Sequence, residues 1–350
     1  MSDIHAGCRS SRHGNHLPIG GVVWKSRVLP ALAAATLATA ASAAISGSAS
    51  AAPLDSTVVV HGSTQGLTIQ HGQVHAGLVR FLIDTTNDQG SDVVMFSPAT
   101  GKTVDKVLAD LHDELSDDPH TAAQGTKELV DDAQFFGLAG VVKGTPAIIT
   151  EQLAAGTYYL FDVNPVFAGA SPQLTTLQLG GPGRGGGNPR FPFPRLGAGF
   201  PFLGHTIKVP AHSITVPLRS SFPLPLPVRS HATVKLTSDD RFDSPDMLPK
   251  AGTITVSNVA DTIHFMQVSP VQPGTTDDDI QRFFDSHDQG QPPFALDGPS
   301  IEMGTLSPGR QADITYNLPA GTYVLQCFIA DDQTGMPHAL MGMHKVVTLK

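Results

Sequence analysis

Two stretches of this chain follow the same plan, and this internal repeat constrains the fold more than any other feature. The first half contains LAAGTYYLFDVNP, from Leu153 to Pro165, and the second contains LPAGTYVLQCFIADD, from Leu318 to Asp332. In both, an Ala-Gly-Thr turn precedes alternating aromatic and aliphatic residues, which is the two-residue period of a β-strand. Upstream, DTTNDQGSDVVMFSP parallels TVSNVADTIHFMQVSP as strand, turn and strand. We therefore expect two copies of one β-sandwich.

A helical segment follows this unit in each copy. In the first, KTVDKVLADLHDEL places its apolar residues on one face at helical spacing, namely Val104, Val107, Leu108 and Leu111. In the second, GTTDDDIQRFFDS offers Thr275 or Thr276 as the N-cap and puts three aspartates in the first turn, where the helix dipole favours negative charge. An apolar strand is then expected before each Ala-Gly-Thr turn, at 141–151 and 311–317. The predicted fold class is all-β, with two tandem Greek-key sandwiches that each carry one inserted helix.

A segment rich in proline and glycine separates the copies. It contains GGPGRGGGNPRFPFPRLGAGFPFLG and SSFPLPLPVRS, in a chain with 35 glycines and 28 prolines. Proline at alternate positions excludes interior strands and favours polyproline II or edge segments. We interpret 180–229 as a Pro/Gly-rich linker with room for one short hairpin in HTIKVPAHSITVPL. A docking site for a proline-recognising partner is the less favoured alternative to a spacer.

The N-terminus has the pattern of an export signal. Lys25 and Arg27 precede the small and apolar run VLPALAAATLATAASAA, and A-x-A cleavage sites follow, the preferred one ending at Ala51. A membrane anchor needs about 18–20 strongly apolar residues, and this run consists mostly of Ala and Thr. Residues 1–51 are therefore predicted to be a signal peptide with an extended n-region, and the protein is expected to be secreted, with cell-wall association left open.

Removal of this segment changes the charge and the cysteine content. Residues 1–51 carry a net charge of +3, so the mature chain carries −12 where the whole chain carries −9. An acidic chain argues against nucleic acid or an anionic membrane as partner, because both call for basic patches. Cys8 lies in the removed segment, so Cys327 is left alone and cannot form an intramolecular disulfide. A lone exported cysteine is a buried apolar residue, an intermolecular link, a reactive thiol or a metal ligand.

The second copy carries the residue types of a mononuclear blue copper centre, which needs two imidazoles, one thiolate and a weak axial thioether. Cys327 offers the thiolate at a strand end, His338 an imidazole and Met343 a thioether. The second imidazole should come from a strand that is distant in sequence and adjacent in the sheet. His264, just after the turn that contains Asn258, stands at such a position.

These residues resemble the cupredoxin family of plastocyanin and azurin. The resemblance lies in the Asn turn followed by His264, then GTYVLQC, then Pro337-His338, then Gly342-Met343, and it covers about 120 residues. It is also similar to exported actinobacterial proteins whose cupredoxin-like C-terminal domain ends in a CF-D-G-PH-GM stretch. The resemblance implies a cupredoxin-like sandwich with one copper ion, held by His264, Cys327, His338 and Met343, and a role in electron transfer or copper handling. It also implies a redox partner protein or a copper donor.

One feature departs from the family pattern. Ten residues separate Cys327 from His338, where plastocyanin and azurin have only a few, so short spacing does not enforce the site here. Each of these residues could alternatively be a buried core residue. A third interpretation combines His338, His344 and the thiol with four methionines into a soft Cu(I) site, the methionines being Met266, Met336, Met341 and Met343.

The first copy lacks the ligands. Alignment on the Ser-Pro ends places Asp92 opposite His264, and alignment on the Gly-Thr-Tyr turns places Asp162 opposite Cys327. Two facing aspartates suit Ca²⁺ in principle, although exposed turn acids are the commoner case. We therefore expect a degenerate cupredoxin-like domain at 52–179 and a domain with the candidate copper site at 230–350.

Enzyme signatures are absent from the sequence. It contains no G-x-S-x-G and no H-E-x-x-H, and GGPGRGGG precedes prolines where a phosphate-binding loop would lead into a helix. Multicopper oxidases need H-x-H pairs, which the chain also lacks, so we do not expect an enzyme. The competing function class is a metal-free extracellular or cell-surface binding module that keeps only the sandwich.

Overall fold

The computed structural model describes residues 56–167, 169–181, 231–286, 292–294 and 298–350. The predicted signal peptide lies outside these residues, as does nearly all of the predicted linker with its hairpin. Within the described residues, no helix is long and apolar enough to cross a membrane.

Among its described residues, the first copy consists of nine strands and three helices. Its strands are β1 (Ser56–Ser63), β2 (Gly66–His71), β3 (Gly77–Thr85), β4 (Ser91–Pro98), β5 (Ala133–Phe135), β6 (Ala139–Val141), β7 (Ala147–Leu153), β8 (Gly156–Asp162) and β9 (Thr175–Leu179). Its helices are α1 (Val104–Glu114), α2 (Pro119–Asp132) and the short α3 (Asn164–Phe167). The expectation of a single inserted helix therefore needs correction here, because α2 follows α1 directly.

The second copy consists of nine strands and one helix among its described residues. Its strands are β10 (His231–Thr237), β11 (Arg241–Asp243), β12 (Met247–Leu248), β13 (Ala251–Asn258), β14 (His264–Pro270), β15 (Ile301–Leu306), β16 (Gln311–Asn317), β17 (Gly321–Gln326) and β18 (His344–Leu349). Its helix is α4 (Asp277–Asp285), where Thr276 forms the N-cap and a capping box with Asp279. The strand predicted at 311–317 is confirmed as β16.

The same pairings recur in both copies. β1 runs parallel to β3, and β10 runs parallel to β13. β4 pairs with β8, and β14 pairs with β17, in both cases antiparallel. The strands alternate as the sequence indicates, so that in β13 Ile254, Val256 and Asn258 are buried while the residues between them are partly exposed. The predicted all-β fold of two repeated sandwiches is confirmed.

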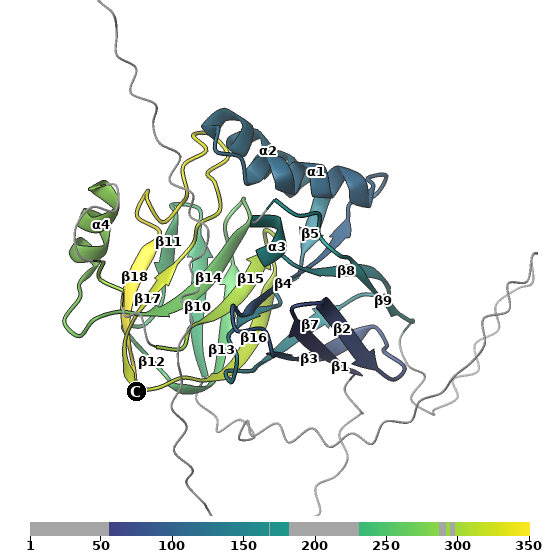
Figure 1. The fold of residues 1–350 in the computed structure, drawn as a ribbon, viewed down its shortest axis with the longest axis horizontal. Helices are drawn as coiled ribbons and strands as arrows, with labels where there is room; N and C mark the ends of the chain where they lie inside the picture. The colour runs from purple at the N-terminus through teal and green to yellow at the C-terminus, as the bar shows by residue number, and fades with distance from the viewer. Residues whose placement is uncertain (1–55, 168, 182–230, 287–291, 295–297) are drawn as a thin grey trace, which may run out of the picture.

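The two copies share their sheets (Figure 1). One sheet has the order β11-β10-β13-β16-β7-β3-β1-β2, and the other has the order β12-β18-β17-β14-β15-β6-β4-β8-β9 with β5 attached to β4. The joins are β16 with β7, where Ile314 faces Ile149, and β15 with β6, where Glu302 faces Gly140. Each copy thus completes the other's edge strands, and the largest cluster of buried apolar residues runs through both copies.

Side chains also cross between the copies. Arg310 of the second copy pairs with the buried Glu151 of the first. The Arg310 guanidinium also lies 4.4 Å from the centre of the Phe136 ring, within the range of a cation–π contact. The junction is therefore polar as well as apolar.

Candidate metal centre

His264 is positioned by the turn that precedes it. Asn258, fully buried at the end of β13, accepts a hydrogen bond from the Ala260 amide at 3.0 Å. Its side-chain amide donates to the carbonyls of Thr262 and Leu306, both at 2.8 Å. This network closes the turn and starts β14 at His264, whose side chain has no exposed surface. The Asn turn of the sequence motif is thus the support of the first imidazole.

Cys327 follows β17 and is also fully buried. Its main chain joins it to the residues that come after the loop: its amide donates to the Met343 carbonyl at 3.3 Å, and its carbonyl accepts from the Ala339 amide at 2.6 Å. The end of β17 is therefore tied to the segment that follows His338.

The ten residues between Cys327 and His338 form a closed excursion. His338 donates its amide to the Ile329 carbonyl at 2.9 Å, and Ala330 and Pro337 form an antiparallel bridge. At the tip, the Asp331 carboxylate accepts from the amide and the hydroxyl of Thr334, at 2.7 and 2.6 Å. Because the base of the excursion is fastened, its length does not move His338 away from Cys327.

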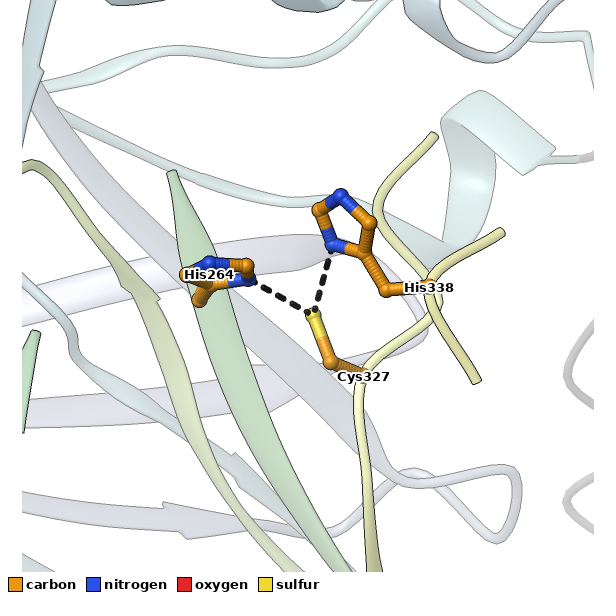
Figure 2. A group of neighbouring side chains, drawn as sticks. All are labelled: His264, Cys327 and His338. Carbon is orange, nitrogen blue, oxygen red and sulfur yellow. Dashed lines mark hydrogen bonds between the residues drawn. The ribbon is translucent and has the colours of Figure 1, made fainter. Parts of the chain in front are cut away.

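Three side chains meet at the base of this loop (Figure 2). The Cys327 Sγ lies 3.8 Å from the Nδ1 of His264 and 3.8 Å from the Nδ1 of His338. A Zn²⁺-sized ion about 2.3 Å from a sulfur and about 2.0–2.1 Å from a nitrogen, with a trigonal angle between them, separates the two atoms by about 3.8 Å. The arrangement therefore has the dimensions of a site with two imidazoles and one thiolate.

Burial fixes the charge states of this group. It lowers the pKa of His264 to about 3, with a further contribution from neighbouring His338, and it lowers the pKa of His338 to about 4. Both imidazoles are therefore neutral and able to bind a metal. Burial also raises the pKa of Cys327 to about 12, against a smaller lowering by the amides of Phe265 and Ile329. A bound cation removes the proton from a coordinating thiol, so metal binding here would release a proton.

Met343 belongs to the same part of the core. Its side chain is fully buried in the apolar cluster that includes Cys327. Its amide donates to the His338 carbonyl at 2.9 Å, and Gly342 before it has a φ of 104°, which favours glycine. The main chain thus holds all three residues of the C-terminal motif together.

The wider soft-ligand cluster does not form as a whole. Met336 is 45% exposed, and His344 turns to α4, where its Nε2 lies 2.9 Å from Gln281 Oε1. Met341 accepts a hydrogen bond from the Thr334 hydroxyl at 3.7 Å. The geometry favours the smaller site over a Cu(I) site built from every sulfur in this region.

Helices of the first copy contact the loop between Cys327 and His338 from outside. The Glu114 carboxylate, at the end of α1, accepts from the Ala330 amide at 3.2 Å and is only 7% exposed. Gly335, with a φ of 69°, approaches α2 so closely that a Cβ at this position would lie 1.9 Å from the Pro119 carbonyl oxygen. No sequence pattern marked these contacts, since they join residues more than 200 positions apart.

Asp240 was also missed by the sequence reasoning. It lies in the turn between β10 and β11, and its Oδ1 is 3.9 Å from the Nε2 of His264 and 3.7 Å from the Nε2 of His338. Burial, together with nearby Asp331, raises the pKa of Asp240 to about 6. In the sequence, Asp239-Asp240 is typical of an ordinary turn, so no motif indicates that Asp240 lies beside the two histidines.

The first copy fills the corresponding position with its own polar groups. The Asp162 carboxylate accepts from the amides of Asp92 and Asn164, both at 3.1 Å, as the Cys327 sulfur does from those of Phe265 and Ile329. By this correspondence Ser91 is the counterpart of His264, so the sequence alignment of Asp92 with His264 is wrong by one residue. The same offset holds along both strands, because Val94 pairs with Phe161 where Gln267 pairs with Gln326, so the two Ser-Pro ends lie one position apart in the sheet. Asp162 is buried, not an exposed turn acid.

Known proteins that resemble this chain were found among solved structures. No protein-family profile matches the chain, and no curated protein matches it in sequence. Among solved structures, auracyanin from Roseiflexus castenholzii is 20% identical over 34% of this chain and 96% of its own, with a TM-score of 0.23. The copper protein rusticyanin is 17% identical over 34% of this chain and 76% of its own, with a TM-score of 0.22.

A third similar structure covers both copies. The Cu-containing nitrite reductase of Thermus scotoductus is 14% identical over 85% of this chain and 68% of its own, with a TM-score of 0.18. The expectation of a non-enzymatic protein stays a prediction.

Proposed function

We propose that this protein binds one copper ion through His264, Cys327, His338 and Met343, and that it serves in electron transfer or copper handling outside the cell. The observation that carries the proposal is the placement of two neutral imidazole Nδ1 atoms 3.8 Å from one buried thiol. A bound copper ion would supply one-electron redox chemistry. Export, the absence of catalysis, and a redox partner or copper donor as the contact in solution belong to the same proposal.

The donor set supports copper over other metals. Two imidazoles and one thiolate with a thioether nearby are typical of blue copper sites, whereas structural zinc sites use four Cys or His ligands. Copper(II) also binds a given nitrogen and sulfur site more tightly than zinc. Two further imidazole nitrogens, the Nε2 atoms of His264 and His338, are buried without a hydrogen-bond partner among the described residues. Unpaired buried donors of this kind are expected where a bound ion sets the protonation of the ring.

The test is copper uptake by the reduced, metal-free protein. We expect one copper per chain, an intense visible charge-transfer band from thiolate to Cu(II), and at least about 100-fold weaker copper binding with loss of the band in Cys327→Ser. Met95→Leu, which replaces a buried sulfur in the first copy, is the matched control and should bind copper like the wild type. Wild-type protein without stoichiometric copper, or with unchanged binding in Cys327→Ser, would favour the metal-free binding module.

A further inference from the structure

The Nε2 atoms of His264 and His338, on the side of each ring away from Cys327, need hydrogen-bond acceptors. A neutral imidazole that binds a metal through Nδ1 carries its proton on Nε2, so each ring must donate there. Both Nε2 atoms are buried and have no hydrogen-bond partner among the described residues. Leaving two N–H groups unpaired in the interior would destabilise the folded protein.

One side chain faces both nitrogens. Asp240 Oδ1 lies 3.9 Å from the Nε2 of His264 and 3.7 Å from that of His338, while the centres of the two rings are 4.7 Å apart. These separations are longer than hydrogen bonds, and a shift of less than 1 Å in one carboxylate would shorten both. Such contacts are often loose in a ligand-free site and tighten when the ligand is bound.

The turn that carries Asp240 is built to hold this position. Asp240 has a φ of 53°. Among the described residues it is the only non-glycine residue with a left-handed backbone. Its amide donates to the Thr237 carbonyl at 3.0 Å, and Arg241 Nη1 donates to the Asp240 carbonyl at 2.7 Å. Strain of this kind concentrates at functional sites, which gives a reason for the unusual backbone.

We propose that Asp240 is a positioning residue that accepts the Nε2 protons of both ligand imidazoles and thereby sets the copper affinity and reduction potential of the site. The inference depends on the proposed copper function. One carboxylate oriented toward two ligand rings fixes both ring orientations, raises their basicity and adds negative charge that stabilises Cu(II) more than Cu(I).

A separate cation site at the same place is less consistent with the contacts. Asp240, Asp331 and His338 do cluster, with ligand atoms within 4.8 Å of one another. However, Asp331 Oδ1 already accepts from the amide and hydroxyl of Thr334 and from the amide of Gln333. His338 Nε2 is also protonated when Nδ1 binds copper, so it is a donor there and not a ligand.

The test compares three variants. Asp240→Asn keeps the shape and tolerates the left-handed backbone but removes the charge, and Asp240→Ala removes the acceptor as well. Asp239→Asn removes the same charge from the exposed neighbour in the same turn and is the matched control. Copper(II) affinity is measured by chelator competition, the potential by redox titration, and folding of each variant by circular dichroism.

The expected order of Cu(II) affinity is wild type, then Asp240→Asn, then Asp240→Ala, with about 10–100-fold lost in Asp240→Asn. With Cu(I) affinity unchanged, that loss raises the one-electron potential by about 60–120 mV. Asp239→Asn should match the wild type in both measurements. Equal affinities and potentials in Asp240→Asn, Asp239→Asn and the wild type would overturn the inference while leaving the copper function intact. A wild type that binds no copper would instead overturn the proposed function.

Discussion

The two copies place different side chains at the same position of the sandwich, at the end of β8 in the first copy and after β17 in the second. In the first, the Ser91 and Thr85 hydroxyls lie 2.9 Å apart and the Asp162 carboxylate accepts from two backbone amides, so the protein satisfies these groups itself. In the second, the same position holds a thiol between two imidazoles, and the outer nitrogen of each ring has no hydrogen-bond partner among the described residues. The same position in the repeated sandwich can therefore hold polar groups that bond to one another, or two imidazole nitrogens that have no described partner.

The contrast is tested most directly by replacing Cys327 of the second copy with aspartate, the residue that the first copy has at this position, Asp162. Cys327→Asp places a carboxylate where the amides of Phe265 and Ile329 donate to the sulfur. The Asp162 carboxylate accepts from backbone amides at the corresponding position of the first copy. We expect a folded protein whose copper affinity is at least about 100-fold lower and whose visible band is lost, because the thiolate is gone. Copper titration followed by absorption checks this outcome.

The reciprocal change is the control. Ser91→His with Asp162→Cys restores one imidazole and the thiol to the first copy, but α3 follows Asp162 where the second copy has its histidine loop. We expect no second copper in this variant. Uptake of two copper ions per chain would show that the loop is not what distinguishes the copies.

The next prediction concerns the support that the first copy gives to the ligand loop. Gly335→Ala should lower the free energy of unfolding by about 4 kcal/mol, because the new Cβ meets the Pro119 carbonyl and the backbone is left-handed. Gly309→Ala is the matched control, since Gly309 has a φ of 73° with no neighbouring atom within 4 Å. It should lose only about 1 kcal/mol. Denaturant unfolding measures both, and equal losses would mean that contact with α2 contributes nothing.

A smaller effect is expected from the carboxyl that touches the loop. Burial raises the pKa of Glu114 from 4.5 to about 7, against a smaller lowering by the Ala330 amide. Between these values the folded protein keeps a proton that the unfolded chain has released, so stability is highest below about pH 4.5 and falls as pH rises toward 7. The loss amounts to about 3 kcal/mol.

Glu114→Gln keeps an acceptor for the Ala330 amide and removes the titration. The variant should gain about 3 kcal/mol relative to the wild type between pH 4.5 and pH 8, measured as the difference between their unfolding free energies. If this difference stayed constant with pH, the ionisation of Glu114 would not affect the stability of the folded protein.

The sequence predicts the local parts of this molecule well. The repeated Gly-Thr-Tyr strands, the Asn258 turn, the apolar face of α1 and the Thr276 cap depend on neighbours within a few residues, and the structure has them all. His264, Cys327 and His338 could be chosen because a familiar residue order surrounds them. The helix α2 was missed although Asp118 followed by Pro119 is a typical helix start.

What the sequence does not predict are contacts between distant segments. The joins between β6 and β15 and between β7 and β16 involve edge strands whose partners no local pattern specifies. Glu114, Asp240 and Gly335 act on residues between 24 and 216 positions away. The one-residue error at Asp92 arose because the matching Ser-Pro residues of the two strands lie one position apart in the sheet, which the residue types do not reveal.

The shared sheets have a consequence for how the protein can be assembled. The copies are joined by two sets of main-chain hydrogen bonds, by a common core and by the Arg310 to Glu151 pair, and none of these uses the covalent connection between Leu179 and His231. The chain could therefore be supplied as two polypeptides, cut between these residues, that associate into the same structure when mixed. Either half alone would expose two open strand edges, so each half would serve as the folding template of the other.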